Sequence, residues 1–281
     1  MDTVSPQSVP PTTALTKPQS TKTLSGPFTL IKKAFTTLFM GQNLGYIIKV
    51  NLVSFLITSV GSFIIILPFA LIVGFTSFDS LSRQAPGLSS PLSNSYTPTL
   101  PLWVSIVQFI LFIPIAAVNL WTFTSQFQAV VQAGKGEIIG TIDTLKIGWS
   151  RTWKLFLTLV LTGLLSALGF VFLIIPGIVI GVWLSFVQWI AITEDLGIVE
   201  TLKKSKALVS GYFWAVWGRF WAFALLMIPI IMVWFLIFFI PIFGIVAILM
   251  ATFLMTPFFL LFQYFLFEDL KRVRGGEEKV E

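Results

Sequence analysis

The chain has 281 residues, of which 56% are hydrophobic and only 11% carry a formal charge. A soluble domain of this length needs more polar surface, so the composition predicts that lipid surrounds most of the chain. The sequence contains no cysteine and no histidine, which excludes disulfides, thiolate metal sites and the commonest general base. The net charge of +6 does not indicate nucleic acid, because the basic residues lie beside apolar runs, where anionic lipid head groups are the simpler partner.

The N-terminal region divides into a polar tail and a short amphipathic helix. Residues 1–27 are rich in Ser, Thr, Pro and Gln, and we expect a disordered cytoplasmic tail because they lack apolar side chains to bury. From Phe28 to Phe39, Ile31, Phe35 and Leu38 recur at helical spacing. This pattern predicts a helix that lies flat in the membrane interface.

Six apolar runs follow, each about as long as the roughly 20 residues that cross a bilayer core. We predict an all-α membrane domain over residues 28–270, with an external loop at 75–100 and a charged, frayed cytoplasmic tail at 271–281. Turns at 175–177 and 240–243 join the last two pairs of spans. The predicted spans are residues 46–74, 102–131, 152–173, 177–193, 213–239 and 244–267.

The spans form three pairs, and an amphipathic segment precedes each pair, at 28–39, 137–149 and 198–209. This order predicts three parallel repeats of a surface helix followed by a transmembrane hairpin. The other explanation is that membrane helices resemble one another in composition. Every second connection between spans is rich in Lys and Arg, and the other connections contain almost none. The positive-inside rule therefore predicts six spans with both termini cytoplasmic, in the plasma membrane.

Two sets of polar residues are candidates for a site. Each predicted hairpin carries a glutamine followed by an aromatic residue, at Gln126, Gln188 and Gln263. These amides could line a shared cavity for a head group or small solute, or they could form hydrogen bonds between helices, the interpretation we favour. The second set is a predicted network of cytoplasmic ion pairs, made of Glu194, Asp195, Lys203, Lys204, Arg219, Glu268 and Asp269.

The segment from Leu173 to Gly211 has a Leu-Ile-Ile-Pro-Gly turn, an acidic exit at Glu194 and a Leu-Lys-Lys-Ser helix. In these features the chain resembles a broad family of uncharacterised bacterial and archaeal six-helix membrane proteins. One branch is the membrane domain fused to some glycerophosphodiester phosphodiesterases. The resemblance implies residence in a membrane and a role near lipid metabolism or envelope maintenance, without phosphodiesterase activity. It carries over no functional residue.

These observations predict a multi-pass membrane protein that is not an enzyme and uses no cofactor or metal. The first interpretation is a scaffold or binding module, with anionic inner-leaflet lipids and a protein at the cytoplasmic face as partners. The alternative is a carrier or binding protein for a lipid or small amphiphile, with its site near the three glutamines. Neither interpretation includes a nucleic acid.

Overall fold

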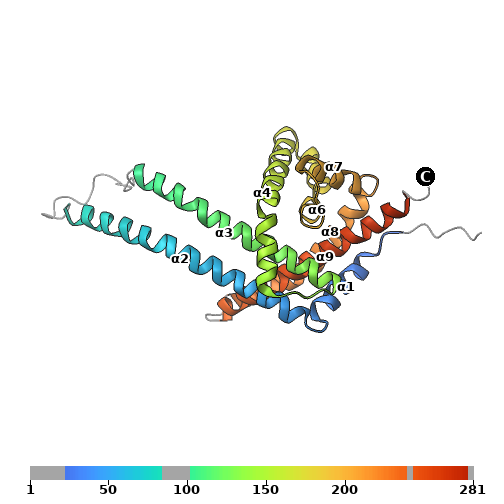
Figure 1. Cartoon of the computed structure of the whole chain (residues 1–281), viewed down its shortest axis with the longest axis horizontal. Coiled ribbons are helices and arrows are strands. Elements are labelled where there is room, and N and C mark those ends of the chain that lie inside the picture. Colours follow the sequence, from blue (N-terminus) through green and yellow to red (C-terminus); the bar gives the residue numbers. More distant parts are fainter. Residues whose placement is uncertain (1–22, 84–101, 239–242, 278–281) are drawn as a thin grey trace, which may run out of the picture.

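The computed structural model describes residues 23–83, 102–238 and 243–277, and within these ranges the regular structure is helical throughout (Figure 1). The all-α prediction is confirmed. The helices are α1 (Pro27–Phe39), α2 (Asn43–Arg83), α3 (Leu102–Lys135), α4 (Thr141–Phe172), α5 (Ile174–Trp183), α6 (Val187–Thr193), α7 (Ile198–Val209), α8 (Phe213–Phe238) and α9 (Phe243–Glu277).

Six stretches are long and apolar enough to cross a membrane, as predicted. They are Asn43–Gly74, Leu102–Lys135, Thr141–Val171, Ile174–Thr193, Phe213–Ile237 and Phe253–Gly275.

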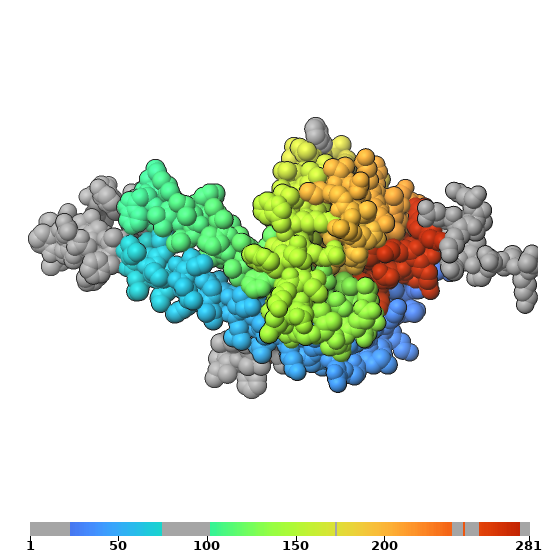
Figure 2. Space-filling view, viewed as in Figure 1, coloured from blue at the N-terminus to red at the C-terminus, as the bar shows by residue number. Residues whose placement is uncertain are grey.

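The helices pack tightly at one end of the molecule and separate at the other. In Figure 1 the α2–α3 hairpin projects to the left and α4 extends upward, while α1 and α9 lie together at the right. The space-filling view shows the same hairpin as an arm that leaves the main body (Figure 2). The exposed faces of this arm are apolar, for example at Phe63 and Phe109, and lipid is the solvent they suit.

The buried core lies where the basic connections are. In this core, the second half of α9 packs with α1, the first turns of α2, the last turns of α3, and α6. From Leu260 to Phe267 every side chain of α9 is buried. A helix that is apolar on all sides is a central helix, so α9 is the element around which the others assemble.

Several predicted boundaries are wrong, and each error has a local cause. Helix α2 has 41 residues and continues to Arg83, so the predicted external loop is helical from 75 to 83. The segment Phe75–Arg83 contains no Gly or Pro that would end a helix. The rest of that predicted loop, from 84, lies outside the described residues, as do residues 1–22, residues 239–242 and the last four residues. The predicted turn at 240–243 therefore falls almost entirely outside them.

The second predicted surface helix is not separate. Residues 141–172 form one helix, α4, which begins after Gly140. No Pro lies between Trp149 and Thr152, and nothing interrupts the backbone hydrogen bonds there. Separate short helices do precede the first and third hairpins, as α1 and α7. The threefold repeat stays a prediction.

The fourth predicted span is two helices, and its connection to α4 is one residue long. Leu173 alone has an extended backbone, with φ −165° and ψ 146°. Pro176 and Gly177 lie in the first turns of α5, where proline is tolerated because the N–H groups have no helical partner. Residues 184–186 then separate α5 from α6.

Two predicted tails are also partly ordered. Helix α9 continues to Glu277, so residues 271–277 are not frayed. Residues 23–26, predicted as disordered, are fixed by Ser25, whose backbone N–H donates to Asp269 Oδ2 at 2.6 Å.

Candidate functional site

The three glutamines do not meet at one point. Gln188 on α6 donates through Nε2 to Gln263 Oε1 on α9 at 3.3 Å. These two amides therefore join two helices, as the structural interpretation of the sequence expected. Gln126 on α3 lines a different feature, a polar pocket between α2, α3 and α9.

The pocket has a volume of about 240 Å³, room for roughly eight waters or a polar head group of that size. Seven of its ten lining residues are polar, which is unusual for helices that face lipid. The lining residues are Asn51, Ser54, Phe55, Thr58, Asn119, Thr122, Phe123, Gln126, Phe253 and Thr256. We call this feature the α2–α3 polar pocket.

One wall of the pocket is a polar stripe on α2. Asn51, Ser54 and Thr58 are spaced by three and then four residues, which places them on one face of a helix. Ser54 is 1% exposed, and its Oγ is a buried atom without a hydrogen-bond partner among the described residues. A buried hydroxyl without a partner costs free energy, so this atom is an unsatisfied polar group in the wall of the pocket.

The opposite wall repeats the same spacing on α3. Asn119, Thr122 and Gln126 are again three and four residues apart. The two stripes meet at Thr58 Oγ1 and Thr122 Oγ1, which are 3.2 Å apart. Two matched stripes on antiparallel helices therefore enclose one polar space between membrane-spanning segments.

The pocket is open to the surface of the molecule. Asn119 and Thr256 are exposed on the surface of the molecule, and Phe55 and Phe123, beside them, are 45% and 39% exposed. The rim thus combines aromatic side chains that lipid tails can contact with polar groups that need hydrogen-bond partners. No lining residue is charged.

The sequence contained a signal for this pocket that our reasoning missed. The comparison of one glutamine from each hairpin does not reveal the pocket, because only Gln126 of the three lines it. Polar residues at the same three–four spacing on two consecutive spans were visible, and they predict a shared face more directly than a glutamine repeat does.

The predicted ion-pair network resolves into two separate groups. The first is centred on Glu194, whose carboxylate lies 2.6 Å from Lys204 Nζ and 3.2 Å from Lys271 Nζ. Burial raises the pKa of Glu194, but the hydrogen bonds and charges of the two lysines outweigh it, so the pKa is lowered overall. Nearby, Lys154 donates to the Glu194 carbonyl at 2.8 Å and lies 3.7 Å from the exposed carboxylate of Asp195.

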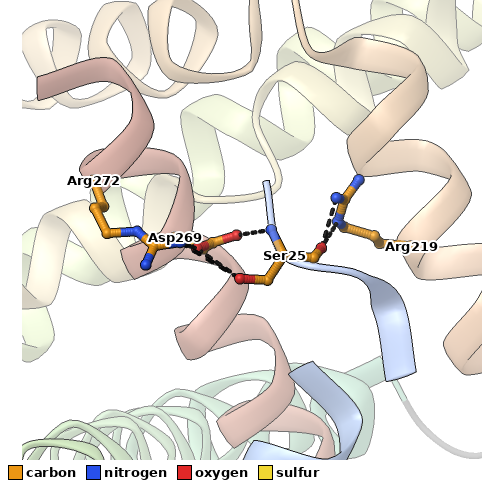
Figure 3. Close-up of polar contacts among 4 residues, drawn as sticks. All are labelled: Ser25, Arg219, Asp269 and Arg272. Atoms are coloured by element: carbon orange, nitrogen blue, oxygen red, sulfur yellow. Dashed lines mark hydrogen bonds and ion pairs between the residues drawn. The ribbon is translucent and has the colours of Figure 1, made fainter. Parts of the chain in front are cut away.

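The second group fixes the N-terminal segment between α8 and α9 (Figure 3). Asp269 accepts hydrogen bonds from the backbone N–H and the Oγ of Ser25, at 2.6 and 3.1 Å, and pairs with Arg272. Arg219 donates to the Ser25 carbonyl through Nε at 2.9 Å and Nη2 at 2.6 Å. Arg219 was expected to pair with a carboxylate directly, but Ser25 lies between it and Asp269.

The remaining two members of the predicted network lie outside these two groups. Lys203 is exposed on α7, and Glu268 is half-buried on α9. Neither joins the two groups just described. The charged residues of this face thus hold helix ends and a terminal segment in place.

A comparison of the chain with protein-family models, curated proteins and solved structures finds no match. The class of the protein therefore rests on its own geometry. It is a multi-pass helical membrane protein with a polar pocket between three of its membrane-spanning helices.

Proposed function

We propose that this protein binds the uncharged polar head of a lipid or small amphiphile in the α2–α3 polar pocket. The observation that carries the proposal is an open pocket between membrane-spanning helices whose two walls are matched polar stripes. The role is binding without catalysis, and we place the protein in the plasma membrane with both termini cytoplasmic.

The lining chemistry favours a neutral head group. Carboxamides and hydroxyls both donate and accept hydrogen bonds, so Asn51, Ser54 and Gln126 suit alcohols, esters and amides. A phosphate would bring a charge into a site without a basic side chain, which is costly in a membrane. Diacylglycerol, with one free hydroxyl and two esters, is a suitable probe.

The opening to the surface favours a ligand with an apolar tail. An amphiphile could place its head in the pocket while its tail stays in lipid beside Phe55 and Phe123. A small water-soluble solute has no apolar part that would contact the aromatic side chains of this rim.

The test measures the retention of dioleoylglycerol by the purified protein in detergent, by native mass spectrometry. Asn51→Leu combined with Gln126→Leu should reduce retention at least tenfold, because two polar partners are lost. Thr58→Val should also weaken retention, whereas the isosteric change Thr162→Val on α4, outside the pocket, should not. Retention unchanged in the double variant, or an equal loss of phosphatidylglycerol retention in that variant, would contradict the proposal.

A partner-binding scaffold is the second candidate, and the exposed lysines of α7 favour it. Lys203 and Lys206 are exposed on this short helix, and such a surface suits an acidic protein or an anionic leaflet. Crosslinking in native membranes checks this role. Recovery of lipid alone, with no reproducible protein partner, would count against a protein partner.

A further inference from the structure

We propose that a second site, distinct from the α2–α3 polar pocket, holds an acyl chain of an anionic phospholipid. The site is a groove between α1, α8 and α9 with a volume of about 360 Å³, within the ~300–1,000 Å³ of typical ligand pockets. Its lining comprises Phe28, Ile31, Lys32, Phe35, Leu38, Phe39, Leu226, Met227, Ile230, Leu254, Met255 and Phe258. We call it the α1 groove.

The floor of the α1 groove belongs to membrane-spanning helices. Leu226, Met227 and Ile230 lie on α8, and Leu254 and Phe258 lie on α9, inside stretches that can cross a bilayer. A groove at this depth is open to lipid tails, and eleven of its twelve lining side chains are apolar. An acyl chain matches this lining, since it offers no polar group that would be left without a partner.

The wall of the groove supplies the charge. Helix α1 carries Lys32 and Lys33 and no acidic residue. Lys33 Nζ lies 4.3 Å from the centre of the Phe265 ring, so its ammonium contacts α9. Lys32 lines the groove and is exposed. Of the two lysines, Lys32 is therefore the one placed to meet a phosphate.

The geometry of α1 supports one occupant that has both an apolar chain and a negative charge. Its apolar face, with Leu30, Ala34 and Leu38 buried, attaches it to the core, and Phe35 packs edge-on against Phe258 at 6.3 Å. The helix is thus fixed with its basic residue beside an apolar groove. A phospholipid with a negative phosphate at Lys32 and a tail between α8 and α9 satisfies both.

The test compares the retention of phosphatidylglycerol and phosphatidylcholine by the full chain in detergent, by native mass spectrometry. The wild type should retain phosphatidylglycerol more strongly. Lys32→Gln should reduce that retention about fivefold, the effect of removing one lysine near an anionic lipid, and leave phosphatidylcholine unchanged. Lys146→Gln, an exposed lysine on α4, should change neither.

A second variant tests the apolar part independently of charge. Ile230→Trp fills the groove and should reduce the retention of both phospholipids, while the part of dioleoylglycerol retention that is lost in Asn51→Leu with Gln126→Leu stays unchanged. Soluble glycerophosphoglycerol, which has no tail, should not compete. The proposal is overturned if Lys32→Gln and Lys146→Gln have equal effects. It is also overturned if Ile230→Trp leaves lipid retention unchanged, or alters only the oligomeric state.

Discussion

At the scale of single residues, the charged side chains act mainly by holding segments that are distant in the sequence. Asp269 is 7% exposed and accepts two hydrogen bonds from Ser25, 244 positions earlier in the chain. Asp195, by contrast, has a fully exposed carboxylate. Exposed ion pairs contribute little, whereas removing the acceptor from buried donors is costly.

We therefore expect Asp269→Ala to lower the free energy of unfolding by about 2 kcal/mol, since the N–H and hydroxyl of the half-buried Ser25 lose a charged acceptor. Asp195→Ala should change it by less than about 0.5 kcal/mol. Denaturation in mixed micelles, followed by circular dichroism, measures both. Equal effects of the two substitutions would show that the Ser25 contact does not stabilise the fold.

Glu194 makes stability depend on pH. Its pKa in the folded protein lies below the ordinary value of 4.5, so its stabilising contribution is present above that value. It is lost as the pH falls through the lower pKa of the folded state. The melting temperature of the wild type should therefore fall on acidification below about pH 4.5 more steeply than that of Glu194→Gln. Parallel pH profiles would contradict this assignment, and Asp195→Asn, with its exposed carboxylate, serves as the control.

At the scale of elements, close contact between α3 and α4 depends on a glycine. A Cβ atom at Gly148 would lie 2.9 Å from the Cα of Ser125, closer than the backbone allows. Gly163, on the same helix, has nothing within 4 Å of its would-be Cβ. The two glycines therefore separate the effect of packing from that of helix propensity.

Gly148→Ala should destabilise the protein by about 1–3 kcal/mol, because overpacking exceeds the gain in helix propensity. Gly163→Ala should be neutral or stabilise it by up to about 1 kcal/mol. The same denaturation assay gives both values. If Gly148→Ala is as stable as Gly163→Ala, α4 does not pack on α3 at this point.

At the scale of the whole molecule, the core is concentrated at the end where the basic connections lie. The α2–α3 arm is long: 41 residues of α2 correspond to about 60 Å of helix, twice the roughly 30 Å of the bilayer core. This helix must tilt or extend beyond the lipid. Tight packing at one end and separated hairpins at the other would leave openings such as the two proposed sites.

The predicted topology can be tested because the chain has no cysteine of its own. We expect Arg83→Cys to react with an impermeant maleimide added to intact cells, and Lys203→Cys to react only after permeabilisation. The physical reason is the bias of basic residues toward the cytoplasm. Labelling of Lys203→Cys in intact cells would reverse the orientation.

Local sequence patterns were sufficient for the class of fold and for two of the short helices. Apolar runs of spanning length predict membrane helices whatever their neighbours are. Helices α1 and α7 have nearly the predicted limits, because their apolar faces and the glycines before them are local signals. The sequence alone also excludes disulfides and thiolate metal sites, because the chain contains no Cys.

Only the tertiary structure decided which polar groups meet. Gln188 pairs with Gln263 across 75 positions, Ser25 with Asp269 across 244, and Gln126 with neither glutamine. Helical periodicity determines the face on which a residue lies, but not which other face packs against it. Which faces pack together depends on how whole helices fit against one another. The packing of α2 against α3 is what brings their two polar stripes together around one pocket.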